Sequence, residues 1–179
     1  MRKSIVIIAA VAALLVPLAA LAVTTPASVA NQICKQELAL QGQGTFNSTY
    51  GTNASRSNAF GKCVAKNAAN AQKDVTSAQS QCKALQADAG FAAAHNGQTF
   101  DQVYGTNSKA EGKGADENAF GKCVSIKAHQ LAAAQAKSET AAAKTCKASL
   151  KADPKAFATN YGTGRSALGK CVSATSNSK

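Results

Sequence analysis

Among the residue types in this chain of 179 residues, cysteine gives the clearest indication of chemistry, because it can bind metals, take part in redox reactions or form disulfides. Metal binding or redox catalysis would favour a Cys-x-x-Cys spacing, which is absent, and only His95 and His129 could complete a zinc site. We therefore expect structural disulfides, with no metal or other cofactor. The six cysteines are Cys34, Cys63, Cys82, Cys123, Cys146 and Cys171.

Other side chains that could catalyse a reaction lack a suitable arrangement. The nine acidic residues are scattered, and no Gly-x-Ser-x-Gly, phosphate-loop or His-Glu-x-x-His motif occurs. Ser, Thr and Asn are abundant, but no base stands at a spacing that would activate them. We therefore expect a protein that is not an enzyme, and a hydrolase is only the third hypothesis of function.

Three lysines stand at one repeated position, inside a Gly-Lys-Cys triplet: Lys62, Lys122 and Lys170. A cation in the opening turns of a helix interacts unfavourably with the helix dipole, so helix electrostatics do not explain these lysines. They are the candidate anion-binding residues. The alternative is that they serve solubility alone, because the remaining lysines form no dense basic run.

These cysteines and lysines belong to a threefold internal repeat with two cysteines in each unit. Each copy begins with Cys-Lys, continues with Phe-x-x-x-Tyr-Gly-Thr and ends with Gly-Lys-Cys-Val. The copies run from Cys34 to Val64, from Cys82 to Val124 and from Cys146 to Val172. So many coincident positions indicate three copies of one structural unit.

Each unit is expected to contain a short helix followed by the start of a second one. Phe and Tyr four residues apart share one helical face, and the Gly after Tyr is where a left-handed helix terminator belongs. The second helix is expected after Asn58, Asn118 and Ser166, which are good N-cap residues. The glycine of each Gly-Lys-Cys triplet predicts that another backbone segment packs closely against it. The expected terminators are Gly51, Gly105 and Gly162, and the triplet glycines are Gly61, Gly121 and Gly169.

Long helices are expected to join the units. From Val64 to Leu85, apolar or small residues recur at alternating spacings of four and three, which is a one-faced helical stripe. The alanine-rich stretch from Val124 to Cys146 is equally helix-prone. The predicted fold is therefore all-α, with three tandem two-cysteine helical units at residues 31–75, 76–137 and 138–179.

Six cysteines allow 15 disulfide connectivities, and three complete copies favour pairing within each unit. Each bridge would fasten the end of one helix to the start of the next and contribute about 3 to 4 kcal/mol in the chain-entropy model. Such bridges matter because only 19 of the 149 residues from Asn31 to Lys179 are Leu, Ile, Val or Phe, too few for a large packed core. The favoured pairs are Cys34 with Cys63, Cys82 with Cys123, and Cys146 with Cys171.

Residues 1–22 have the features of a signal peptide. Two basic residues precede an apolar run from Ile5 to Val16, and Ala20-Leu21-Ala22 has small residues where signal peptidase reads them. Cleavage after Ala30 and an uncleaved membrane anchor are the alternatives. Removal would lower the net charge from +11 to +9, because both basic residues leave with the segment. We expect a secreted or extracytoplasmic protein of the cell envelope.

The repeated motif resembles one found in uncharacterised exported proteins of actinobacteria, the high-GC Gram-positive bacteria. The likeness rests on Tyr-Gly-Thr-Asn followed by Asn-Ala-Phe-Gly-Lys-Cys-Val and on a similar alanine-rich composition. It covers about Cys34 to Val172, although the third unit has Leu168 in place of Phe and Gly164 in place of Asn. The resemblance implies an exported bacterial protein and assigns no activity, catalytic residue or binding residue.

The preferred functional hypothesis is a non-catalytic exported or envelope-associated protein that binds an anionic polymer or surface through its repeated lysines. An anionic cell-wall polymer or the membrane surface is the expected partner. Nucleic acid is disfavoured without being excluded, because the chain has no dense basic run. A ligand-free spacer or assembly protein is the alternative, and the oligomeric state does not follow from the sequence.

Overall fold

The computed structural model describes residues 24–105 and 118–176, so the expected signal peptide lies outside the described residues. All regular secondary structure in these two ranges is helical, which confirms the all-α fold class. The helices are α1 (Pro26–Gln41), α2 (Gln43–Tyr50), α3 (Ala59–Ala87), α4 (Phe91–Ala94), α5 (Phe100–Tyr104), α6 (Ala119–Ala152), α7 (Pro154–Tyr161) and α8 (Ala167–Ser176).

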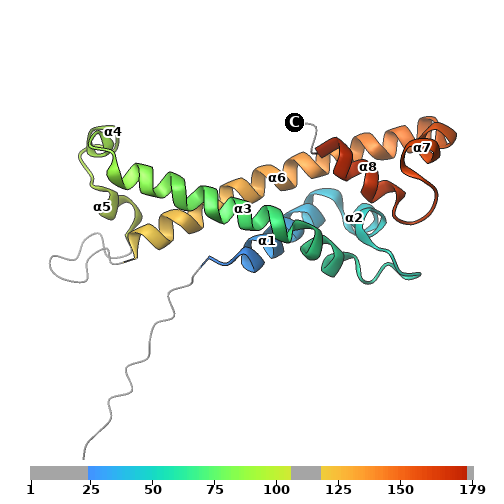
Figure 1. Cartoon of the computed structure of the whole chain (residues 1–179), viewed down its shortest axis with the longest axis horizontal. Helices are drawn as coiled ribbons and strands as arrows, with labels where there is room; N and C mark the ends of the chain where they lie inside the picture. The colour runs from blue at the N-terminus through green and yellow to red at the C-terminus, as the bar shows by residue number, and fades with distance from the viewer. Residues whose placement is uncertain (1–23, 106–117, 177–179) are drawn as a thin grey trace, which may run out of the picture.

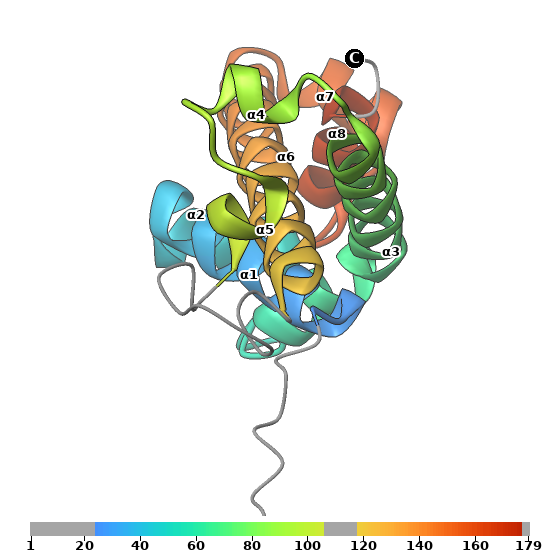
Figure 2. The same ribbon diagram turned by 90° about the vertical axis from the view of Figure 1, so that its left-hand side faces the viewer.

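The two long helices α3 and α6 form the frame of the molecule and cross each other along its longest axis (Figure 1). Near one end, α4 and α5 connect the end of α3 to the start of α6, and Figure 2 views the molecule from that end. Towards the other end, α7 and α8 lie along the later part of α6. Helix α1 packs against both long helices, and α2 contacts α3 and α8. The predicted long connecting helices are therefore confirmed.

Local capping explains where several helices begin. Thr25 caps α1 and Thr99 caps α5, each through a reciprocal capping box. Asp153 caps α7 by accepting a hydrogen bond from the Ala156 backbone N–H at 2.8 Å, and Pro154 occupies the first helical position. The starts of these three helices therefore follow from residues within one turn of the boundary, whereas Asn58 and Asn118 make no side-chain capping hydrogen bond to α3 and α6.

The short aromatic helices end differently from the prediction. Gly162 has a positive φ of 83°, which favours glycine, but its ψ of 176° lies outside the αL conformation, and Gly51 and Gly105 are extended with φ of −70° and −68°. The left-handed terminator is therefore wrong for the first two units. Gly51 is needed for a steric reason, because a Cβ there would lie 2.5 Å from the Cβ of Arg56 and 2.6 Å from the carbonyl oxygen of Asn47.

The buried residues form three clusters instead of one large core. The largest joins α1, α3, α4, α5 and α6, and seven of its fifteen buried residues are alanines. Small side chains let the long helices approach closely while burying little apolar area per residue. The other two clusters surround the first and third disulfides. Alanine contacts and covalent links therefore take the place of bulky core residues.

The three disulfides have the predicted pairing. The bridges close loops with sequence separations of 29, 41 and 25 residues, and all six cysteines are buried. Structural disulfides of this kind persist in oxidising, extracytoplasmic compartments. Among the described helices, none combines the length and apolarity needed to cross a membrane. The bridges are Cys34–Cys63, Cys82–Cys123 and Cys146–Cys171.

Candidate anion-binding groove

Two of the three candidate lysines come together in the structure. Lys62 from the start of α3 and Lys170 from the start of α8 line one shallow hollow of about 220 Å³, together with Lys66 one turn further along α3. We call this hollow the lysine groove. Its lining residues are Thr49, Tyr50, Thr52, Lys62, Lys66, Ser166, Gly169, Lys170 and Ser173.

The groove exists because α2 packs across the start of α8. A Cβ at Gly169 would lie 2.6 Å from the carbonyl oxygen of Thr49, so only glycine allows this contact. The predicted close backbone approach is therefore confirmed at Gly169. It is wrong at Gly61 and Gly121, where a Cβ would meet nothing within 4 Å, because these two glycines lie on exposed helix surface.

Lys122 does not belong to the groove. It is half-buried near the start of α6, which lies beside α5 at the end of the molecule away from α7 and α8 (Figure 1). The three repeated lysines thus do not form one face. The crossing of α3 and α6 separates the second unit's lysine from those of the first and third units.

The groove carries positive charge that is not neutralised by described side chains. The ammonium group of Lys66 lies 3.5 Å from Glu139 Oε2, which is the one ion pair within residues 24–105 and 118–176, and 5.1 Å from the centre of the Tyr50 ring. Lys62 and Lys170 are both exposed. They are therefore the two cations available to an anion from solution.

Beneath the groove, one tyrosine hydroxyl lies between two buried carboxyl groups. Tyr50 Oη is 2.5 Å from Glu37 Oε2 and 2.7 Å from Glu139 Oε2. A phenol has one proton and can donate to only one of these oxygens. The second short contact therefore requires a proton on one carboxyl group, which then donates to the tyrosine oxygen.

Glu37 is the carboxyl group that holds this proton. Burial, followed by the negative charge of Glu139, raises the pKa of Glu37 from 4.5 to about 8. Glu139 lies 3.5 Å from the Lys66 ammonium group and accepts a hydrogen bond of 2.8 Å from Gln135. Burial also raises the pKa of Tyr50 above its ordinary value, so the phenol remains protonated. The result is a hydrogen-bonded chain from Glu37 through Tyr50 to Glu139.

This network connects the groove floor to the first disulfide. Gln135 Nε2 donates to Asn67 Oδ1 at 2.7 Å, and Asn67 Nδ2 lies 3.5 Å from the Cys63 sulfur. The network is buried, since its members include Glu37, Asn67 and Glu139. It therefore supports Tyr50 and Lys66 on the interior side of the groove. We assign it a supporting role in the groove.

The sequence contains a signal for these buried acids, because each stands on the apolar stripe of its helix. Glu37 stands four residues after Ile33 and three after Cys34, both fully buried on the same face of α1. Glu139 stands three residues after the buried Ala136 on α6. An acidic residue on the apolar stripe of a helix indicates a buried carboxyl group with a specific partner.

The histidines take no part in the groove. His95 stacks on Phe91 with a ring separation of 3.8 Å, and His129 is exposed. Among the described residues, no group of three or more His, Cys, Asp or Glu could hold a metal ion. No protein-family model matches the chain, and no curated protein or solved structure shows significant similarity to it. Function is therefore inferred from the groove itself.

Proposed function

We propose that the protein is an exported, non-catalytic protein of the cell envelope that binds an anionic polymer in the lysine groove. The observation that supports this proposal is the convergence of Lys62 and Lys170, from the first and third units, on one groove. The groove is shallow, which suits a polymer strand lying across it better than an enclosed small molecule.

The side chains of the groove favour phosphate-rich or carboxylate-rich chains. Lysine attracts such groups as a compact point charge without demanding one geometry, which suits a repeating anion. The hydroxyl group of Ser166 adds a hydrogen-bond donor. Sequence-tolerant binding of single-stranded nucleic acid would also need exposed aromatic rings for base stacking, whereas Phe46 and Tyr50 are buried. An anionic cell-wall polymer is therefore the preferred partner, ahead of a membrane surface.

The start of α1 supports cleavage of the expected signal peptide after Ala22. Val29 and Ala30 are fully buried in the largest cluster, and α1 begins at Pro26. Cleavage after Ala30 would remove these contacts and the Thr25 cap. Cleavage after Ala22 would leave all of α1 in the mature protein.

The proposal is tested with the variant Lys62→Gln/Lys170→Gln and the control Lys73→Gln/Lys83→Gln, which removes two exposed α3 lysines outside the groove. Affinities for long-chain polyphosphate and for heparin are measured across a salt series. We expect the groove variant to bind roughly tenfold more weakly with a smaller salt dependence, because two counterion-releasing contacts are lost. Equal losses in both variants, or no binding by the unmodified protein at low salt, would contradict the proposal.

A ligand-free spacer is the second candidate, and the length of α6 favours it. A helix of 34 residues spans about 50 Å. Solution scattering that shows an elongated particle, together with no binding to either polymer, would support this role instead of the first.

A further inference from the structure

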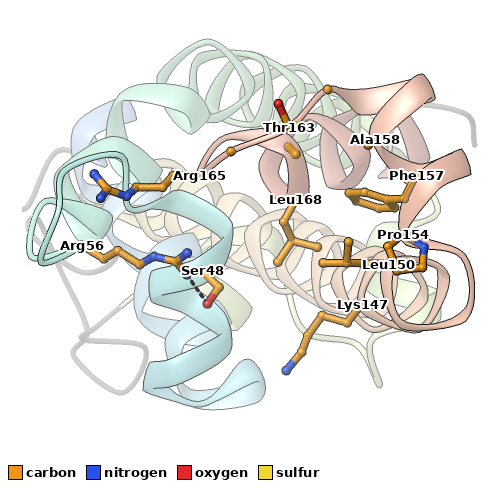
Figure 3. A pocket seen from close by; sticks show the side chains of 13 residues that line it. Ser48, Arg56, Lys147, Leu150, Pro154, Phe157, Ala158, Thr163, Arg165 and Leu168 are labelled. Carbon is orange, nitrogen blue, oxygen red and sulfur yellow. Dashed lines mark hydrogen bonds between the residues drawn. The ribbon is translucent and has the colours of Figure 1, made fainter.

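A second cavity, larger than the lysine groove, lies between the first and third repeat units (Figure 3). Its volume of about 390 Å³ is in the range of small-molecule pockets, roughly 300 to 1,000 Å³. Phe157, Leu168 and Leu150 form an apolar side, and Arg56 and Arg165 lie on the opposite side in Figure 3, where the Arg56 side chain points towards Ser48 and the Arg165 side chain points away from the apolar residues. None of the 13 described residues that line it is acidic.

The arginines of this cavity are notable because arginine is rare in the chain. The sequence has three arginines against seventeen lysines, and Arg56 and Arg165 are the two that lie outside the expected signal peptide. They come from corresponding loops, each between the Tyr-Gly pair and the second helix of its unit. Guanidinium groups differ from ammonium groups in donating two parallel hydrogen bonds to a carboxylate or phosphate.

The structure also fixes one of these arginines in place. The Arg56 guanidinium donates a hydrogen bond to the Ser48 hydroxyl (Figure 3). The Arg56 backbone has φ of 56°, a left-handed conformation that is costly for a residue with a side chain. Lys147 is a third cation on the cavity wall, and its ammonium group donates to Thr45 Oγ1 at 3.1 Å. Three cations around one cavity repel each other, and a bound oxyanion would relieve that repulsion.

The apolar side of the cavity is incompletely covered. Leu150 is 40% exposed and is one of three large hydrophobic residues exposed in the described part of the chain. Phe157 and Leu168 are buried beside it. A ligand with an apolar portion would cover Leu150 and gain burial energy that inorganic phosphate could not.

We propose that this cavity binds a small amphiphilic oxyanion, meaning a phosphate or carboxylate group attached to a short apolar chain or ring. The guanidinium groups of Arg56 and Arg165 hold the anionic head, and Leu150, Phe157 and Leu168 contact the apolar portion. This site is separate from the lysine groove, and its ligand is a single small molecule.

The first test measures binding of three probes by calorimetry, with octyl phosphate and octyl glucoside below their micelle concentrations. The probes are octyl phosphate, inorganic phosphate as the head alone, and octyl glucoside as a neutral apolar control. We expect octyl phosphate to bind at least tenfold more tightly than either of the others, because only it engages both sides of the cavity. Equal affinities for octyl phosphate and either control would overturn the proposal.

The second test uses single substitutions at exposed positions, where folding should be retained. Arg165→Gln should weaken octyl phosphate binding roughly tenfold, and Arg165→Lys should restore it only in part, because lysine cannot donate two parallel hydrogen bonds. Leu150→Gln should weaken it without changing the affinity for inorganic phosphate. The control Lys155→Gln removes one charge from α7 outside the cavity and should change the affinity less than twofold. An unchanged affinity in Arg165→Gln, or an equal loss in the control, would refute the site.

Failure of this proposal is distinguishable from failure of the polymer-binding proposal. The single variant Lys62→Gln should bind octyl phosphate as tightly as the unmodified protein, because Lys62 does not line this cavity. Lys170 is left in place, because its ammonium group would lie 3.8 Å from a Cβ at Gly162, which lines the cavity. A loss of octyl phosphate binding in that variant would contradict the separation of the two sites.

Discussion

At the scale of single residues, the buried contacts of Tyr50 show how the protein places two acids side by side. Two ionised carboxylates at this depth would each lose hydration and repel the other. A proton on Glu37 removes one of these negative charges, and the Lys66 ammonium group lies 3.5 Å from Glu139. The network should therefore be more stable while Glu37 keeps its proton.

This protonation makes stability depend on pH. The pKa of Glu37 is about 8 in the folded protein against 4.5 as its ordinary value, so between these values folding takes up a proton. The free energy of unfolding should therefore fall as pH rises from about 5 to 8, by up to about 1.4 kcal/mol per pH unit. Glu37→Gln should flatten this dependence, because the amide does not titrate and its NH2 group can donate to the Tyr50 hydroxyl oxygen as a protonated carboxyl does. Urea unfolding at several pH values measures the effect.

The matched control for Glu37→Gln is Asp101→Asn, which neutralises an exposed carboxylate in the first turn of α5. It should leave the slope over the same pH range nearly unchanged. An equally steep slope in Glu37→Gln and the unmodified protein would show that Glu37 is ionised in the folded state.

At the scale of helices, the contact between α2 and α8 joins the first repeat unit to the third. Gly169 lies at the point of closest approach, directly against the carbonyl oxygen of Thr49. This packing forms one wall of the lysine groove and brings Lys170 to the same side as Lys62. The groove is therefore a property of the packing between units and is absent from any single unit.

Gly169→Ala should push α8 away from α2 and destabilise the protein by about 1 to 3 kcal/mol, because the added Cβ would overlap a backbone oxygen. Gly61→Ala is the matched control, at the equivalent triplet position but with nothing within 4 Å of the new Cβ. It should stabilise the protein by about 0.5 to 1 kcal/mol through helix propensity. Denaturant midpoints for both variants provide the measurement, and similar shifts of the same sign would contradict the proposed contact.

At the scale of the whole molecule, three covalent bridges hold together helices whose shared interior is rich in alanine. Each alanine buries little apolar surface, so the free energy of folding per residue is small before the bridges are counted. The bridges reduce the conformational freedom of the unfolded chain, and their contribution grows slowly with loop length. The folded structure should therefore depend on the cysteines being oxidised to disulfides.

After complete reduction with a thiol reagent, the protein should be largely unfolded near room temperature. It should then show no cooperative unfolding transition and a weaker helical circular dichroism signal. Replacing one bridge, as in Cys82→Ala/Cys123→Ala, should cost about 2 to 4 kcal/mol and leave a folded protein. Reversible denaturation of each form measures these differences. A fully reduced protein that kept its helicity and its unfolding midpoint would disprove the dependence on disulfides.

The amino-acid sequence by itself determined the all-α class and the two long connecting helices, and among 15 possible connectivities it favoured the disulfide pairing that the structure has. The helices follow from helical periodicity, and the favoured pairing follows from the presence of two cysteines in every copy. Each of these features depends on residues within one repeat unit or within the long helix that follows it.

Only the tertiary structure decided which residues meet across units. Lys62 lines the same groove as Lys170, and Arg56 lines the same cavity as Arg165, because α2 and the loop after it pack against the third unit. Lys122 lies apart from both, because the start of α6 is beside α5 at the opposite end of the molecule (Figure 1). The raised pKa of Glu37 likewise depends on burial between helices and then on the charge of Glu139, more than one hundred residues away. Contacts between such distant positions are set by how the helices pack, which no local pattern of residues specifies.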